Sequence, residues 1–231
     1  AVMFRRSGGS ALTAAACLAA AMLLSGAAFA CERTHRTIEL APGQNVGGAA
    51  PGYAPAGLRE KEVVLTFDDG PDPASTPRIL DILREACAPA TFFMLGGPAG
   101  ARPPLGKRGL DEGHAVGGHT LNHIDLSETP FDAATQEIAR GFLPVAAAGG
   151  PSNLFRFPLL RSTQPLLAWL REHGMAAVGV DIDPVDWAGD PPQATLARLK
   201  DQIRRQGRGI ILLHDSQPNT AALLPDLIAF L

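Results

Sequence analysis

The feature that most constrains the fold is a strict alternation of short apolar runs with longer amphipathic stretches. The apolar runs are rich in strand-forming residues, and the stretches between them carry apolar residues at helical spacing. Such alternation favours parallel strands joined by right-handed crossovers. We therefore expect an α/β fold, either a barrel or an open doubly wound sheet. The predicted strands are Val63–Phe67, Ala90–Leu95, Ala115–Gly117, Leu154–Phe157, Ala176–Asp181 and Gly209–Leu213.

Several helix boundaries are also marked in the sequence. Thr76-Pro77, Thr129-Pro130 and Asp190-Pro191 each place a capping residue before a proline at the first helical position. Gly174 and Gly207 follow predicted helices, as glycine commonly does at a helix end.

The composition predicts one globular domain and argues against nucleic acid as a partner. The chain has 231 residues, of which 46% are hydrophobic, so a substantial core can form. The formal net charge is −3, which gives no basic surface for a polyanion. A neutral or weakly charged substrate is expected, and we expect a monomer.

Residues 1–30 have the pattern of a secretory signal peptide. Met3–Arg6 supplies positive charge, Ala11–Leu24 is apolar, and Ala28–Ala30 reads A-x-A, which predicts cleavage after Ala30. An uncleaved membrane anchor is one alternative, because the apolar stretch approaches the length of a span. A lipoprotein attached at Cys31 is a weaker one. All three predict export, to the periplasm or outside the cell.

Residues 31–58 are rich in Gly, Ala and Pro without a sustained period, which predicts a linker or an arm laid over the surface. The domain is then expected to occupy residues 59–231. Export would permit a disulfide between Cys31 and Cys87, although two cysteines do not establish one.

Two adjacent carboxylates, Asp68 and Asp69, end the first predicted strand of this domain and precede a Gly-Pro turn. Neighbouring acids are costly to hold ionised together, and a divalent cation between them removes that cost. The alternative is an ordinary turn in which Asp acts as a capping residue.

His119 and His123 follow the third predicted strand and are four residues apart. On one face of a helical turn they could grip one metal ion. Two histidines and one carboxylate would leave coordination positions open for water and substrate, as in a catalytic site. The sequence does not identify the ion, which could be zinc, cobalt, manganese or nickel.

Other polar residues follow the later strands. Arg156 needs an acid if it is buried, and the Asp that does not bind metal is a natural partner, the alternative being a surface Arg beside a turn. His214 ends the sixth strand, where it is well placed as a general acid. Asp183, Asp186 and Trp187 could orient that histidine and offer a sugar an apolar face, whereas the same loop's Asp181 and Asp190 read as solvated acids.

Five segments in this order resemble the motifs of the polysaccharide deacetylases, carbohydrate esterase family 4, which includes the chitooligosaccharide deacetylases of nodulation-factor synthesis. The resemblance runs from about Glu62 to the end of the chain. The segments are Thr66–Gly70, His119–His123, Arg156–Pro158, Asp183–Trp187 and Leu212–His214.

The resemblance implies a distorted (β/α) barrel of about seven units and one divalent metal ion, zinc in the first instance. It implies Asp69, His119 and His123 as metal ligands, Asp68 as general base held by Arg156, and His214 as general acid tuned by Asp186. Trp187 and Leu212 would form an apolar wall around the acetyl group, and the Leu159 N–H would bind the oxyanion. The list of implied site residues is therefore Asp68, Asp69, His119, His123, Arg156, Leu159, Asp186, Trp187, Leu212 and His214.

The sequence departs from the family pattern at two places. Leu159 and Leu160 stand where an aromatic residue and a glycine are usual. The chain also stops at Leu231, where the family normally adds a strand, so the barrel is expected either to lack its last strand or to be truncated.

The implied activity is removal of N-acetyl groups from an amino-sugar glycan of chitooligosaccharide or peptidoglycan type, with release of acetate. Three alternatives remain open at this stage. They are an O-acetyl esterase acting on xylan-type polysaccharide, a non-catalytic sugar-binding domain, and a metal-dependent hydrolase of small amides on a similar barrel.

Overall fold

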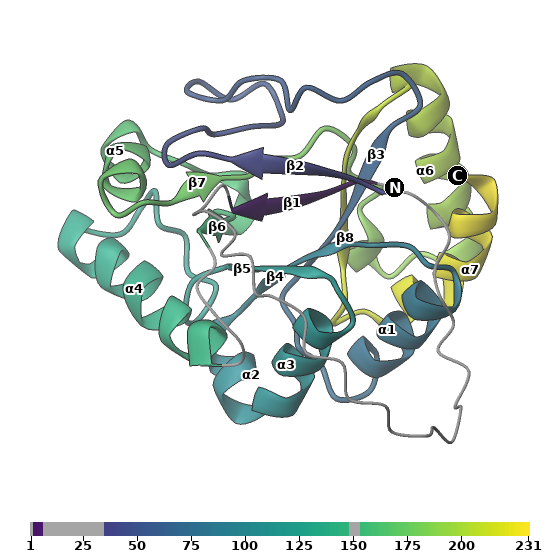
Figure 1. The fold of residues 1–231 in the computed structure, drawn as a ribbon, viewed down its shortest axis with the longest axis horizontal. Coiled ribbons are helices and arrows are strands. Elements are labelled where there is room, and N and C mark those ends of the chain that lie inside the picture. Colours follow the sequence, from purple (N-terminus) through teal and green to yellow (C-terminus); the bar gives the residue numbers. More distant parts are fainter. Residues whose placement is uncertain (1, 7–34, 148–152) are drawn as a thin grey trace, which may run out of the picture.

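The computed structural model describes residues 2–6, 35–147 and 153–231, which form a parallel sheet with helices packed around it on all but one side (Figure 1). The strands are β1 Val2–Arg6, β2 Arg36–Leu40, β3 Val63–Asp68, β4 Thr91–Met94, β5 Ala115–Gly118, β6 Leu154–Phe155, β7 Ala176–Ala177 and β8 Gly209–His214. The helices are α1 Thr76–Glu85, α2 Gly96–Ala101, α3 Pro103–Asp111, α4 Phe131–Ala147, α5 Gln164–Glu172, α6 Pro192–Gln206 and α7 Pro218–Phe230, with short 3₁₀ turns at Pro158–Leu160 and Asp186–Ala188.

All six predicted strands are present, and every strand pair is parallel. The strand order is β2-β1-β3-β4-β5-β6-β7, and β8 pairs with β3 over its whole length. The segment that follows β7 pairs with β8 through one isolated β-bridge, between Ile182 and Ile211. The fold is therefore a distorted barrel that the strand ladders do not close.

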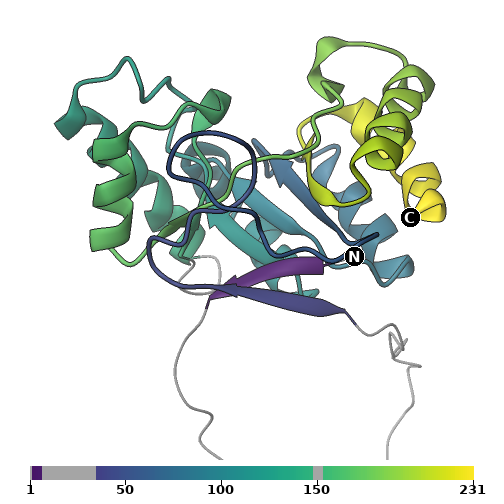
Figure 2. The same ribbon diagram turned by 90° about the horizontal axis from the view of Figure 1, so that it is seen from above.

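Strands β1 and β2 were not predicted. They pair with each other in parallel and lie side by side along one side of the sheet (Figure 2). Val2 and Phe4 of β1 are buried with Leu40 of β2 in one core cluster. Apolar residues alternate too briefly here for the pattern to stand out from a predicted n-region and a predicted linker. The apolar run and cleavage site of the predicted signal peptide lie outside the described residues.

The helices pack their apolar faces on the sheet, as their spacing predicts. Ile79, Leu80 and Leu83 of α1 are buried against the core that contains the stacked rings of Phe67 and Phe92. Three helix starts differ from the predicted ones by one residue: α1 begins at Thr76 with Ser75 as its cap, α4 begins at Phe131, and α6 begins at Pro192. Helix ends shift easily because the terminal turn can be extended or tightened.

Cys87 is disulfide-bonded, while Cys17 and Cys31 lie outside the described residues. Within the described residues, no helix combines the length and the apolar character that a membrane span requires.

Helix α4 approaches the loop after β5 through a glycine. A Cβ atom on Gly141 would lie 2.3 Å from the carbonyl carbon of Thr120, and one on Gly96 would lie 2.6 Å from the Gly141 Cα. Backbone leaves no space for a side chain at either position. Gly141 therefore sets how closely α4 packs on the loop that carries His119 and His123.

We predict that Gly141→Ala lowers the free energy of unfolding by about 1–3 kcal/mol, the usual cost of forcing extra atoms into a packed core. Gly109→Ala in α3 is the matched control, because its Cβ would meet Met94 and Val116 at 3.8 Å, an ordinary contact. That control should be neutral or gain about 0.5–1 kcal/mol from helix propensity. Thermal and urea unfolding measure both variants, and equal stabilities would show that the close approach at Gly141 is unimportant.

Candidate active site

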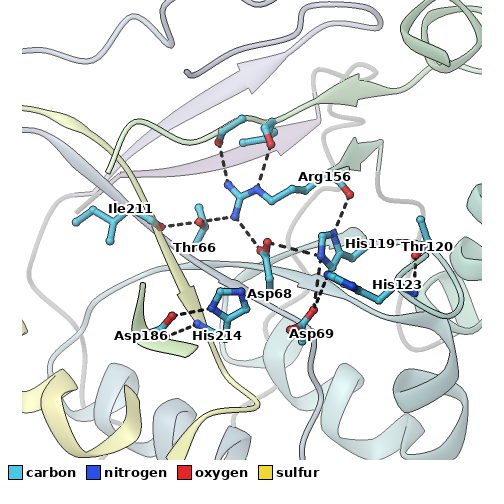
Figure 3. A network of polar contacts seen from close by, with 12 residues as sticks. Thr66, Asp68, Asp69, His119, Thr120, His123, Arg156, Asp186, Ile211 and His214 are labelled. Carbon is cyan, nitrogen blue, oxygen red and sulfur yellow. Dashed lines mark hydrogen bonds and ion pairs between the residues drawn. The ribbon is translucent and has the colours of Figure 1, made fainter. Parts of the chain in front are cut away.

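The predicted site residues gather at the carboxyl ends of the strands, as the strand pattern predicts. Asp68 ends β3, His119 follows β5, Arg156 follows β6, and His214 ends β8. Because Asp68 and His214 are paired neighbours on adjacent strands, the base and the acid predicted from the motifs start from one edge of the sheet. Figure 3 shows these side chains converging from four separate elements.

Asp69, His119 and His123 form the one group in the described part of the chain whose atoms could hold a metal ion. The Oδ1 atom of Asp69 lies 3.6 Å from Nε2 of His119 and 3.5 Å from Nε2 of His123. Ligands bound at about 2.0–2.1 Å and at tetrahedral angles lie about 3.3–3.4 Å apart, so the spacing suits a zinc-sized ion. Asp69 Oδ1 is buried and has no hydrogen-bond partner among the described residues, which leaves it available as a ligand.

The histidine pair does not lie on a helical turn, and that expectation is wrong. The segment from His119 to His123 is a loop in which Thr120 and His123 adopt left-handed φ values of 71° and 59°. The Thr120 hydroxyl accepts the His123 N–H at 3.0 Å. From α4, the Glu137 carboxylate accepts the N–H groups of Leu121 and Asn122. The loop brings the two rings to 5.0 Å between centroids without helical geometry.

The surroundings of His119 favour the neutral imidazole, the form that can bind a metal ion. Its Nδ1 lies 2.8 Å from the carbonyl oxygen of Arg156, so Nδ1–H donates to that oxygen and Nε2 keeps a free lone pair. Burial lowers the pKa of His119 to about 3, against the opposing charge of Asp69. The ring is therefore neutral at physiological pH. These three residues fit a divalent cation in charge, donor type and spacing.

The second aspartate, Asp68, faces a buried arginine. Nη1 of Arg156 donates to Asp68 Oδ1 at 2.8 Å and to Thr66 Oγ1 at 2.7 Å. Its Nε and Nη2 atoms donate to the carbonyl oxygens of Val178 and Gly179, and its guanidinium lies 4.3 Å above the Phe93 ring. This arrangement confirms the predicted Arg156 partner and excludes the surface alternative.

The same surroundings set the basicity of Asp68. Burial raises its pKa above the ordinary value, and the charges of Arg156 and His214 oppose that rise. A carboxylate that is more basic than a free aspartate suits a general base near neutral pH. Because Oδ1 is held by Arg156, Oδ2 is the oxygen that faces His119, at 3.8 Å from its Nε2.

On the other side of the site, Asp186 holds His214. Its Oδ1 lies 2.7 Å from His214 Nδ1, and its Oδ2 accepts the His214 backbone N–H at 2.8 Å and the Thr220 hydroxyl. Burial alone would lower the pKa of His214, but the hydrogen bond and charge of Asp186, with the charges of Asp68 and Asp69, raise it to about 9. The imidazolium is therefore the form present at neutral pH, as a proton donor requires.

A cleft of about 390 Å³ joins the two sides, within the range typical of small-molecule sites. Trp187 and Leu159 are more than half exposed at its rim, whereas Leu212 is buried at its wall. It is lined by Asp68, Asp69, His119, His123, Phe157, Leu159, Leu160, Arg161, Asp183, Trp187, Leu212 and His214. All the site residues implied by the resemblance line this cleft except Arg156 and Asp186, which support it from behind.

Asp181 is not a solvated loop acid, which corrects the expectation for it. Its carboxylate accepts the backbone N–H groups of Gly48 and Ile210, so it joins the segment after β2 to β8. Asp190 pairs with Arg198 near the surface.

Comparison with known proteins agrees with this geometry. The family model described as polysaccharide deacetylase matches residues 56–178, more than half of the chain. The chain belongs to the polysaccharide deacetylase family. A chitooligosaccharide deacetylase of Bradyrhizobium sp. (strain ANU 289) is 37% identical over 161 residues, which cover 68% of this chain and 72% of that protein. A peptidoglycan-N-acetylglucosamine deacetylase of Bacillus cereus is 35% identical over 159 residues, covering 68% and 73%.

Solved structures show the same fold. A family 4 carbohydrate esterase from Streptomyces lividans in complex with acetate superposes with a TM-score of 0.67 and 32% identity, covering 73% of this chain and 86% of that one. A Bdellovibrio bacteriovorus peptidoglycan deacetylase gives 0.72 and 31%, covering 81% and 52%.

This polysaccharide deacetylase differs from the family pattern most visibly at Leu159 and Leu160. Both have left-handed φ values, 56° and 57°, a conformation that costs a leucine about 1–2 kcal/mol. Leu160 therefore keeps the backbone turn for which the family pattern has a glycine. Its side chain adds an apolar surface to the cleft.

The raised pKa of His214 predicts a pH dependence of stability. Between the unfolded value of 6.5 and the folded value of about 9, the native protein binds more protons than the unfolded chain. The protonation of His214 therefore adds its full contribution to the free energy of unfolding below pH 6.5, and this contribution is lost as the pH rises through 9. We therefore expect the metal-free protein to lose stability from about pH 7 to pH 9, at up to about 1.4 kcal/mol per pH unit.

Chemical unfolding at a series of pH values measures this slope. Asp186→Asn is the comparison variant, because it removes the charge and the acceptor that raise the His214 pKa. The variant should show a much flatter profile over the same interval. An equal slope in both proteins would mean that another group is responsible.

Proposed function

We propose that this family member is a metal-dependent enzyme that removes N-acetyl groups from amino-sugar glycans of chitooligosaccharide or peptidoglycan type and releases acetate. The observation that carries the proposal is the division of labour between adjacent aspartates. Asp69 faces both histidines through one oxygen, whereas Asp68 is ion-paired with Arg156 through Oδ1 and keeps Oδ2 available as a base. Relatives named for both glycans support the substrate class.

Asp69, His119 and His123 would hold the ion, with zinc as the first candidate and cobalt, manganese or nickel as alternatives. A divalent cation in that position would polarise the acetyl carbonyl and lower the pKa of water.

The chain's own residues supply the remaining steps. Asp68 Oδ2 takes a proton from the attacking water, while Arg156 keeps Oδ1 in place. The Leu159 N–H is the proposed donor to the oxyanion, and the apolar faces of Trp187 and Leu212 enclose the acetyl methyl group.

The protonation state of His214 favours an amide over an ester as the substrate. An amine leaves only when protonated, whereas an alkoxide needs less help from an acid. Asp186 fixes Nδ1 of His214 and leaves Nε2 to donate to the leaving nitrogen. A pKa raised to about 9 keeps that proton in place at neutral pH.

Acetate release tests the proposal directly. The purified, zinc-loaded protein would be incubated with chitooligosaccharides, peptidoglycan and acetylated xylan, each also tested after the metal is removed with a chelator. We expect acetate from one or both amino-sugar glycans, loss of activity on chelation, and recovery with zinc or cobalt. Acetate from xylan alone would identify an O-acetyl esterase, and glycan binding without turnover would identify a binding module.

Substitutions at the two aspartates should fail in different ways. We predict that Asp68→Asn retains the metal but lowers turnover by about 10²–10⁴-fold, the usual contribution of a positioned proton acceptor. Asp69→Asn should weaken metal binding itself, because it removes a ligand charge, and excess zinc should partly restore its activity. Metal content and acetate release at low and high zinc measure both effects.

The converse pattern would reverse this assignment: loss of metal from Asp68→Asn and its retention by Asp69→Asn. Full metal content and activity in both variants would place the site elsewhere.

We further propose that the protein is exported to the periplasm or outside the cell, on the basis of the leader-like residues 1–30. Strand β1 bears on this proposal, since Val2 and Phe4 are buried in the fold and a chain cut after Ala30 lacks them. N-terminal sequencing of protein from its native cells decides between these arrangements. A start at Cys31 supports export with a sheet that begins at β2, whereas full-length cytoplasmic protein contradicts export.

A further inference from the structure

Asp215 is a buried carboxylate next to the proposed general acid, and the mechanism above gives it no role. It follows β8 directly and is only 1% exposed. Its Oδ1 atom has no hydrogen-bond partner among the described residues. A buried acid that is incompletely paired is expensive for stability alone, so its contacts warrant an explanation.

Asp215 contacts both residues that flank Asp69. The Asp215 backbone N–H donates to the carbonyl oxygen of Asp68 at 3.2 Å. The Asp215 carboxylate also lies directly against Gly70, where a side chain would not fit. Asp215 is thus hydrogen-bonded to the residue before the metal-ligand candidate and packed against the residue after it.

These contacts of Asp215 matter because the backbone of Asp69 is strained. Its φ of 76° lies in the left-handed region, which non-glycine residues adopt only when their surroundings enforce it. That conformation lets two adjacent aspartates face different partners. Gly70 must also lack a side chain, since a Cβ there would lie 2.0 Å from Asp215 Oδ2.

A second set of contacts connects Asp215 to α1. The Thr76 hydroxyl donates to Asp215 Oδ2 at 2.5 Å, and the Ser75 hydroxyl donates to the Asp215 carbonyl oxygen at 2.5 Å. Thr76 Oγ1 in turn accepts the Asp72 N–H at 2.7 Å. Asp215 therefore joins the end of β8, the loop after β3 and the first turn of α1.

We propose that Asp215 is a positioning residue that holds Asp69 in its left-handed conformation and fixes its distance from His214. The metal-ligand carboxylate and the proposed acid are then set by one residue rather than by two independent loops. The turnover part of this inference rests on the proposed function, whereas the metal-affinity part does not.

The experiment compares Asp215→Asn and Thr76→Val with Asp201→Asn, an exposed acid on α6 that serves as the control. Each full-length protein is characterised by zinc affinity in a chelator competition, by the visible spectrum of the cobalt-loaded form, by unfolding of the metal-free form, and by kcat and KM. We expect Asp215→Asn to bind zinc about 10–100-fold more weakly, the usual cost of removing an outer partner of a metal ligand.

The kinetic constants separate positioning from general support of the fold. In Asp215→Asn at saturating zinc, kcat should fall by about 10–100-fold while KM stays close to that of the unmodified enzyme, because the displaced groups act on the reacting atoms. Thr76→Val removes one bond to the carboxylate and should change the same quantities in the same direction, by less. The control should match the unmodified protein throughout.

A lower unfolding temperature with unchanged zinc affinity, cobalt spectrum and kcat would overturn the proposal and leave Asp215 a structural role only. If Asp215→Asn does not fold, Thr76→Val decides by the same criteria. Wild-type protein that binds zinc but releases no acetate would contradict the proposed function, and the zinc-affinity comparison would still test Asp215.

Discussion

The buried ion pair between Arg156 and Asp68 is the interaction on which the rest of the site depends. Removing two charges from water costs several kcal/mol per ion, and the cost is offset only by good geometry and further hydrogen bonds. Arg156 has both, since it bonds Asp68, Thr66 and two backbone carbonyl oxygens. It occupies one oxygen of Asp68 and fixes the carboxylate, whereas Asp69 Oδ1 has no such partner in the described part of the chain and faces both histidines. The pair therefore separates a base from a metal ligand only one residue apart.

The surroundings of the two buried histidines place them in different protonation states. His119 is buried and donates through Nδ1 to a neutral carbonyl, which keeps it uncharged. His214 is also buried but donates to the carboxylate of Asp186, which keeps it protonated. The same type of side chain is thus suited to be a metal ligand at His119 and a proton donor at His214. Figure 3 shows the two histidines on opposite sides of the aspartate pair.

The sequence predicted strands β3 to β8 and the residues that follow them, because apolar runs and the polar residues at their ends are local patterns. It could not predict how the histidine loop is held, because Glu137 and Gly141 lie on α4 and act on backbone atoms of a distant segment. The four-residue spacing suggested a helical turn, and left-handed residues in a loop produce the same convergence. Asp215 escaped notice for a related reason: its partners, the Asp68 carbonyl oxygen and the hydroxyls of Ser75 and Thr76, lie far from it in the sequence. Strand β1 was missed because its short basic sequence also fits a leader.

Anomalous X-ray diffraction at the zinc absorption edge, from crystals of the zinc-loaded full chain, tests the central claim most directly. The account predicts one strong peak coordinated by Asp69 Oδ1 and by Nε2 of His119 and His123, at about 2.0–2.2 Å. It also predicts that Asp68 remains bonded to Arg156 and does not coordinate the ion. A peak coordinated by Asp68, or no peak between Asp69 and the two histidines, would contradict it.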